Sequence, residues 1–141
     1  MKRLLVGIDG SPEAAAAVQT AAGLAKALAA KLLLVFVAPR HMPRVTGSFE
    51  AEAGGADLVE HDYVPALLFQ AELACRHAGV EADTTCLAGP VAETLADLAE
   101  TGDFDLVVVG HRGRGAVRRV LLGSVADRLV QICSRPVLVI R

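Results

Sequence analysis

The sequence predicts a single α/β domain built on a doubly wound, five-stranded parallel sheet with helices on both faces. Short apolar runs alternate along the chain with longer stretches of helical periodicity, as in a sheet whose strands are joined by helices. The apolar residues make up 53% of the chain and are mostly Ala, Leu and Val, which suits helices packed closely on buried strands. A length of 141 residues fits one domain, 1–141, which buries about two-thirds of its unfolded surface.

The first strand, the first helix and the second strand follow from the N-terminal part of the chain. Leu4–Ile8 is an apolar strand, and the Asp-Gly pair behind it marks a turn. Ser11 offers a hydroxyl that caps a helix, and Pro12 fits the first helical position, where its missing N–H costs nothing. We expect the alanine-rich helix to end near residue 30 and a second buried strand to cover 32–37.

Both patterns fail between residues 40 and 61. Pro43 and three glycines lie there among acidic and small residues, so we expect a long loop from Arg40 to about His61. Helical periodicity returns over 62–78 and stops at Gly79. A weaker strand is predicted to follow over 83–87.

The C-terminal part of the chain repeats the alternation twice. A helix is expected over 91–101, and the most regular apolar strand covers 106–109 and ends at Gly110. A loop rich in glycine and arginine leads to a helix over 123–133. The last apolar run, 136–140, is the fifth strand.

Right-handed crossovers arrange these five strands most simply in the order 3-2-1-4-5, which reverses direction between strands 1 and 4. Ligands of such sheets bind at the carboxyl ends of the strands that flank the reversal. Those ends carry Asp9-Gly10-Ser11 and the loop that begins at Gly110. The sequence therefore predicts a ligand cleft where these two segments meet.

The loop after the fourth strand has the composition of a phosphate site. Glycines at its start let backbone N–H groups approach a ligand closely, and Gly123-Ser124 opens a helix whose positive end suits an anion. Four arginines of the loop offer positive charge nearby: Arg112, Arg114, Arg118 and Arg119.

The spacing of these residues resembles the universal stress protein family, whose ATP-binding members carry Gly, two residues, Gly, nine residues, then Gly-Ser or Gly-Thr. The chain matches this pattern in full at Gly110, Gly113, Gly123 and Ser124. The first strand and turn, the second strand and the C-terminal run 134–139 are also similar to the family, so the resemblance covers nearly the whole chain. It implies the adenine nucleotide alpha hydrolase-like fold.

The resemblance also implies the ligand, which is ATP with or without Mg. Asp9 and Val37 would lie beside the adenine and the ribose, with Val37 contributing its backbone. The first two glycines of the motif would border the ribose and phosphates, and the start of the last helix would hold the phosphates. The implied nucleotide-binding residues are Asp9, Gly10, Ser11, Val37, Gly110, Arg112, Gly113, Gly123, Ser124 and Val125.

Two positions near this site, Asp9 and Ser11, also have a structural interpretation, and two others, Phe36 and His111, differ from the family's usual residues. Asp9 also fits a structural role, accepting backbone hydrogen bonds in its turn, and Ser11 is a cap rather than a nucleophile because no basic partner is implied. The family often has His where Phe36 stands, a change of little consequence. It has Ser or Thr where His111 stands, which leaves the role of His111 open.

The function expected from these residues is a binding module, in which ATP changes the shape or partners of a stress-response regulator. No catalytic residue is assigned and hydrolysis is at most slow, since no Walker lysine follows the glycines. Two alternatives stay open, a dimeric stress protein that acts through protein contacts without nucleotide, and a nucleotidyl-transfer or ATP-pyrophosphatase enzyme on the same fold. A phospho-receiver domain is excluded because Ala88 stands where its acceptor Asp belongs.

Composition and charge narrow the partners further. A net charge of −2 gives no field that attracts nucleic acid or anionic lipid, and no run is long enough to span a membrane. Three cysteines and four histidines lack metal-ligand spacing, so we expect no metal site, small buried thiols and a reducing, cytoplasmic location. The last strand is apolar and lies at the sheet edge, which predicts a homodimer through this strand.

Overall fold

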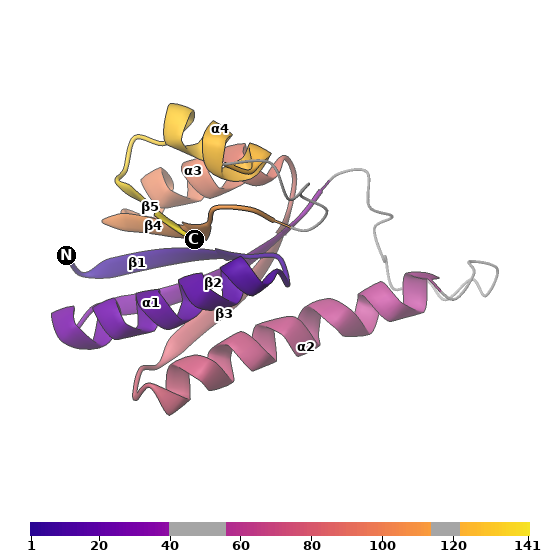
Figure 1. Cartoon of the computed structure of the whole chain (residues 1–141), viewed down its shortest axis with the longest axis horizontal. Coiled ribbons are helices and arrows are strands. Elements are labelled where there is room, and N and C mark those ends of the chain that lie inside the picture. The colour runs from indigo at the N-terminus through magenta and orange to yellow at the C-terminus, as the bar shows by residue number, and fades with distance from the viewer. Residues whose placement is uncertain (40–55, 114–121) are drawn as a thin grey trace.

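Five parallel strands form one sheet in the order β3-β2-β1-β4-β5 in the computed structural model, which describes residues 1–39, 56–113 and 122–141 (Figure 1). This is the order predicted from the sequence. The strands are β1 (Arg3–Ile8), β2 (Lys31–Ala38), β3 (Ala82–Ala88), β4 (Leu106–Gly110) and β5 (Val137–Ile140).

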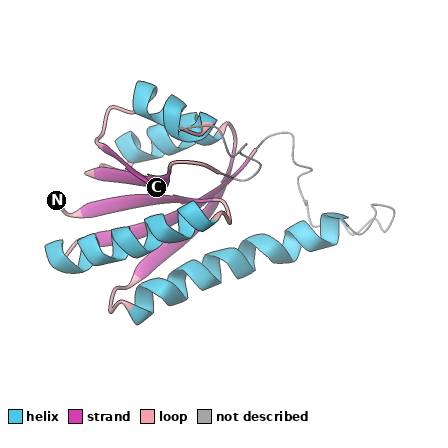
Figure 2. Cartoon of the chain, viewed as in Figure 1, coloured by secondary structure: helices cyan, strands magenta, loops and turns pink. Residues whose placement is uncertain are grey.

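Helices cover both faces of this sheet, as Figure 2 shows. The helices are α1 (Pro12–Leu28), α2 (Ala56–His77), α3 (Val91–Thr101) and α4 (Ser124–Ile132). α1 and α2 lie on one face and α3 and α4 on the other. The predicted doubly wound α/β architecture is therefore confirmed.

The central strand β1 divides the core into two halves. Leu4 and Val6 are fully buried against the α1 and α2 face, whereas Leu5 is fully buried against the α3 and α4 face. This alternation follows from the two-residue period of a strand, and a strand covered on both faces is apolar throughout. The fully buried Ala17 and Ala21 let α1 approach the sheet closely.

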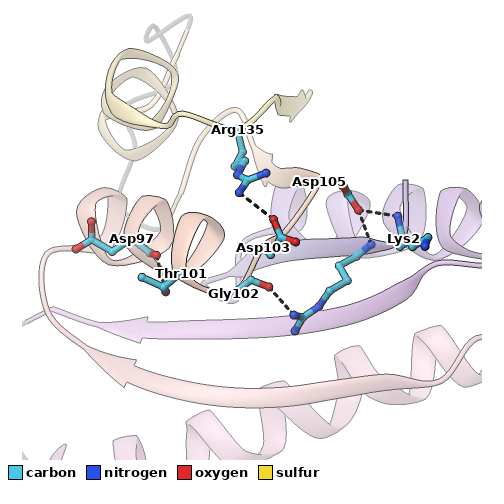
Figure 3. A network of polar contacts seen from close by, with 8 residues as sticks. Lys2, Asp97, Thr101, Gly102, Asp103, Asp105 and Arg135 are labelled. Atoms are coloured by element: carbon cyan, nitrogen blue, oxygen red, sulfur yellow. Dashed lines mark hydrogen bonds and ion pairs between the residues drawn. The ribbon is translucent and has the colours of Figure 1, made fainter.

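Polar contacts join the segments at the amino ends of β1 and β4, which lie at the opposite end of the strands from the predicted cleft (Figure 3). The Asp105 Oδ2 atom accepts hydrogen bonds from the backbone N–H groups of Lys2 at 2.6 Å and Arg3 at 2.9 Å. These two bonds hold the pKa of Asp105 below its usual value. The Arg3 guanidinium donates to the Gly102 carbonyl and lies over the Phe104 ring, 4.5 Å from its centroid.

The boundary predicted for the second helix was wrong. α2 begins at Ala56, six residues before the predicted start at 62, so the loop expected up to His61 is shorter. Apolar periodicity is weak over 56–61, but the last helix-breaking residue of this region is Gly55, and acidic residues near a helix start are favourable. The remainder of the expected loop, 40–55, lies outside the described residues.

The expectation of three buried thiols holds for only one cysteine. Cys75 belongs to α2 and is fully buried in the core between this helix and the sheet. Cys133 is partly exposed, and Cys86 is exposed on β3 because that strand lies at the sheet edge. Within the residues that the structure describes, no helix is long and apolar enough to cross a bilayer.

Candidate functional site

A cavity of about 550 Å³ opens at the carboxyl ends of β1, β2 and β4, between the starts of α1 and α4. Its floor is apolar, with Val35 and Val109 from the sheet, and Leu95 of α3 belongs to an apolar wall. Asp9, His111 and Arg112 provide its charged and titratable side chains. This is the place that the strand order predicts for a ligand.

The turn after β1 positions Asp9 through local hydrogen bonds. The Asp9 Oδ1 atom accepts the Ser11 backbone N–H at 2.9 Å, and Gly10 adopts a φ of 86°, which glycine adopts without strain. The buried Ser11 hydroxyl then accepts the Ala14 backbone N–H at 3.1 Å and caps α1. The structural roles expected for Asp9 and Ser11 are both present.

The glycine loop after β4 meets Asp9 at the cleft. A Cβ atom placed on Gly113 would lie 2.5 Å from Asp9 Oδ2, so the Gly113 backbone lies directly against this carboxylate. Only a residue without a side chain permits that approach. The two segments that the topology places together are therefore in contact.

The other two glycines of the motif are required by packing within the protein. A Cβ on Gly110 would lie 2.8 Å from the backbone carbon of Glu13, so β4 ends in close contact with the first turn of α1. A Cβ on Gly123 would lie 3.0 Å from the His111 carbonyl oxygen, which also accepts the Gly123 N–H at 2.5 Å. These contacts join the beginning of the loop to the start of α4.

The amino end of α4 borders the cavity and offers backbone N–H groups. Gly123 is its N-cap residue and makes no side-chain cap, while Ser124, Val125 and Ala126 follow and line the cavity. The first N–H groups of a helix have no intrahelical acceptor, and the helix dipole makes this end positive. This geometry suits an anionic group in the cavity.

Arg112 is held by an ion pair with Glu13 of α1. The Arg112 Nη2 atom lies 3.0 Å from Glu13 Oε1, and the two side chains are 28% and 18% exposed. The pKa of Glu13 lies below its usual value, first because of a backbone hydrogen bond at its own position, then because of the Arg112 hydrogen bond and charge. The pair fixes the loop to the first turn of α1.

His111 connects the loop to the edge strand β5. Its backbone N–H donates to the Ile140 carbonyl at 2.6 Å, and its Nδ1 atom lies 3.2 Å from the same oxygen. The ring is partly buried and lines the cavity. His111 therefore holds the loop against the end of β5.

The cavity brings together most of the residues that the sequence proposes for the site. Those that line it are Asp9, Val37, Gly110, Arg112, Gly113, Gly123, Ser124 and Val125. Gly10 and Ser11 instead line a smaller cavity of about 180 Å³ between α1 and α2. Three of the arginines noted in the sequence, Arg114, Arg118 and Arg119, lie outside the described residues.

Sequence reasoning missed two parts of this site. The first is the apolar wall formed by Val91 and Leu95 of α3. The amphipathic pattern of α3 predicts that its apolar residues face the protein interior, but does not indicate that these two border a cavity. The second is Glu13. Acidic residues are common in the first turn of a helix because they interact favourably with the helix dipole, so Glu13 gave no sign of a role at the site. Among the described residues, no three His, Cys, Asp or Glu side chains gather as a metal site requires.

Comparison with known proteins gives a match over the whole chain. Residues 1–141 match the model of the Universal stress protein family. A universal stress protein of Methanocaldococcus jannaschii is 30% identical over 143 residues, covering 99% of this chain and 82% of that protein. The universal stress protein YxiE of Bacillus subtilis is 29% identical over 145 residues, covering 99% of this chain and 98% of that protein.

Some relatives are longer than this chain. A universal stress protein of Mycobacterium tuberculosis is 34% identical over 151 residues, which cover 97% of this chain. The chain spans about half the length of that protein, 47%.

Solved structures share the fold. A universal stress protein in complex with cAMP has a TM-score of 0.76 and 25% identity, covering 99% of this chain and 97% of that one. A universal stress protein from Archaeoglobus fulgidus in complex with dAMP has a TM-score of 0.72 and 20% identity, covering 100% and 98%. The fold is the adenine nucleotide alpha hydrolase-like fold.

Proposed function

The chain belongs to the universal stress protein family, and we propose that its cleft binds an adenine nucleotide, ATP with or without Mg, as a regulatory module. The observation that carries the proposal is the contact between Gly113 and the Asp9 carboxylate. It brings the glycine loop, the start of α4 and a carboxylate together in the lining of one cavity. The residues proposed to bind the nucleotide are those of the predicted set that line the cavity: Asp9, Val37, Gly110, Arg112, Gly113, Gly123, Ser124 and Val125. Gly10 and Ser11 line the smaller cavity and shape the turn that holds Asp9.

The chemistry of the cavity matches the parts of a nucleotide. Its volume of about 550 Å³ lies in the range of small-molecule sites, roughly 300–1,000 Å³. The apolar side chains of Val35, Val109 and Leu95 suit a purine base, and the Asp9 carboxylate suits ribose hydroxyls. The amino end of α4 and the backbone of the glycine loop suit phosphates. The complex of a 25% identical relative with cAMP supports an adenine nucleotide as the ligand class.

Two measurements test this proposal. Mass spectrometry of the small molecules released on denaturing the purified protein is expected to detect an adenine nucleotide. Calorimetry is expected to detect ATP binding, and no binding at millimolar ATP together with no released nucleotide would falsify the proposal.

Gly123→Val locates the site. A Cβ at this position lies 3.0 Å from the His111 carbonyl oxygen and 3.1 Å from the Arg112 Cα, so valine forces the glycine loop away from the start of α4. Because the phosphates are proposed to lie where these two segments meet, we expect binding to be lost. Gly23→Val is the matched control, because a Cβ on Gly23 meets nothing within 4 Å and the residue is exposed on α1. Circular dichroism establishes that both variants fold. Unchanged affinity in folded Gly123→Val would place the ligand elsewhere.

We propose hydrolysis that is slow at most, with no catalytic residue. The Ser11 hydroxyl is already used as the α1 cap, which is unfavourable for a nucleophile. Release of phosphate or pyrophosphate from ATP at turnover rates typical of enzymes, about 1 per second or faster, would favour the enzyme alternative.

We also propose a cytoplasmic homodimer that pairs through β5. This strand is an edge of the sheet, and all four of its apolar residues are partly exposed. Exposed edges of this kind are commonly covered by a partner. Light scattering at tens of micromolar protein is expected to give the mass of a dimer, and a monomer mass would contradict the proposal. A dimer that binds no nucleotide would favour the alternative of a protein acting through contacts alone.

A further inference from the structure

The Glu13–Arg112 ion pair adds a charged group to the cleft that the nucleotide motif does not contain. Arg112 lines the cavity, and Glu13 contacts Arg112 from the first turn of α1 without lining the cavity itself. Glu13 therefore influences a bound ligand through its charge and through Arg112.

The position of Glu13 is fixed by the fold. Its backbone carbon and Cβ both lie 2.8 Å from the place of a Cβ on Gly110, so the first turn of α1 packs tightly on the end of β4. A backbone hydrogen bond and then the Arg112 contact hold the pKa of its carboxyl below the usual value, and the carboxylate is ionised at neutral pH. The negative charge beside Arg112 is thus a constant feature of the cleft.

The described residues give the cleft little positive charge. Arg112 is the only Arg or Lys among the described residues that line the cavity, and Asp9 is the only carboxylate among them. Glu13 lies 3.0 Å from Arg112 and offsets its charge. A ligand phosphate therefore meets Arg112 already paired, which matters more as the charge of the phosphate chain grows.

We propose that Glu13 is a specificity-determining residue that limits the preference of the cleft for triphosphates over monophosphates by neutralising Arg112. This inference rests on the proposed binding of adenine nucleotides at the cleft. ATP carries about twice the negative charge of AMP at neutral pH, so it loses more from the Glu13 charge and gains more from its removal.

Glu13→Gln tests the role of the charge. The Gln side chain keeps an oxygen that accepts the Arg112 hydrogen bond, so Arg112 stays in place while one negative charge is lost. From the size of partly exposed charge interactions, we expect ATP affinity to rise by about 2–5-fold and AMP affinity by less than about 2-fold. The ratio of the two dissociation constants, measured by calorimetry at fixed ionic strength, is the readout.

Two further variants make the test specific. Glu72→Gln removes the same charge from another Arg pair, at 2.6 Å on α2, away from the cleft, and is expected to leave the ratio at the wild-type value. Glu13→Asp keeps the charge but shortens the side chain by one methylene group, and is expected to hold the ratio closer to the wild-type value than Glu13→Gln does. A merely structural role for Glu13 would alter both affinities together.

The outcomes separate this inference from the proposed function. An unchanged or lowered ATP-to-AMP preference in Glu13→Gln, with nucleotide still bound, overturns the role of Glu13 and leaves the binding function standing. An equal rise of the preference in Glu72→Gln also overturns it, because net charge alone would then explain the effect. If the wild-type protein binds neither nucleotide, the proposed function fails and this inference fails with it.

Discussion

Asp9 uses its two carboxylate oxygens for two different purposes. Oδ1 accepts the Ser11 N–H at 2.9 Å within the turn, and Oδ2 lies against the Gly113 backbone at the cleft. An asparagine preserves an oxygen for the turn but removes the charge. The two roles are therefore separable by one substitution.

We predict that Asp9→Asn lowers nucleotide affinity by about tenfold, because hydrogen bonds to charged groups contribute about 1.5–3 kcal/mol. The free energy of unfolding is expected to change by less than about 1 kcal/mol, since the turn keeps its acceptor. Calorimetry and urea denaturation measure the two effects. Asp97→Asn on the exposed face of α3 is the control and should change neither. A large loss of stability with unchanged affinity would assign Asp9 to the turn alone.

The close packing at Gly110 leads to a prediction about the stability of the protein in the absence of any ligand. An added Cβ would lie 2.8 Å from the Glu13 backbone, which cannot move without shifting α1. We expect Gly110→Ala to lower the free energy of unfolding by about 1–3 kcal/mol, measured by urea denaturation.

Gly23→Ala is the matched control for this effect. Gly23 lies inside α1 with open space around its Cα, so alanine is expected to stabilise the protein by up to about 1 kcal/mol. Equal effects of the two substitutions would show that contact with Glu13 is not the reason for glycine at 110.

Among individual residues, the sequence predicts the hydrogen bonds that form between residues close together in the chain. Ser11 capping α1 and Asp9 bonding its own turn both involve residues two or three positions apart. The Glu13–Arg112 pair joins residues 99 positions apart, and no local pattern indicates it. Long-range side-chain pairs depend on the final packing of α1 against β4, which a single sequence does not specify.

Among the helices and strands, the predicted bounds were accurate where the apolar periodicity and the helix-breaking residues indicate the same ends. α3 has the predicted bounds, 91–101, because Pro90 precedes it and an amphipathic pattern fills it. The start of α2 was placed too late because its first turns lack the apolar period. Residues 56–61 contain no Gly or Pro, so nothing in the sequence prevents the helix from starting directly after Gly55.

The pairing of β1 with β4 contains an acid-sensitive contact. Asp105 accepts the Lys2 and Arg3 N–H groups at the start of these strands, and these bonds lower its pKa in the folded protein (Figure 3). A lowered folded pKa means that the stabilisation is present above the unfolded pKa, near 3.8, and is lost as pH falls through the folded value.

We therefore predict that Asp105→Asn is less stable than wild type at pH values above about 5, and that the difference shrinks as the pH falls below about 4. Urea denaturation of both proteins across this range measures the difference. A gap that is independent of pH would show that the contact does not depend on the charge of Asp105.

For the whole molecule, the strand order and the place of the cleft follow from rules that need no side-chain detail. Right-handed crossovers fix the order, and the reversal between β1 and β4 fixes the edge where ligands bind. The shape of the cavity could not be predicted, because its wall of Val91 and Leu95 depends on how α3 packs on the sheet. The position of the cleft thus follows from the strand order, whereas the shape of the cavity, on which ligand specificity depends, follows from side-chain packing.

The same topology leaves one half of the β5 backbone at the open edge of the sheet. The Pro136 carbonyl accepts the Val107 N–H and the Ile140 carbonyl accepts the His111 N–H, so even-numbered residues of β5 face β4. Alternation along a parallel strand then directs the N–H and C=O groups of Val137 and Val139 outward. A second copy of the chain would pair with these groups in the proposed homodimer.

We predict that Val139→Pro is monomeric by light scattering at protein concentrations where the wild type is dimeric. Proline removes an outward N–H and its ring obstructs an approaching strand, while the bonds from β5 to β4 remain, as edge strands tolerate proline. Val139→Ala retains the N–H and is the control, expected to stay dimeric. Dimers of Val139→Pro as stable as those of the wild type would exclude backbone pairing at this edge, and dissociation in Val139→Ala alone would assign the contact to side chains.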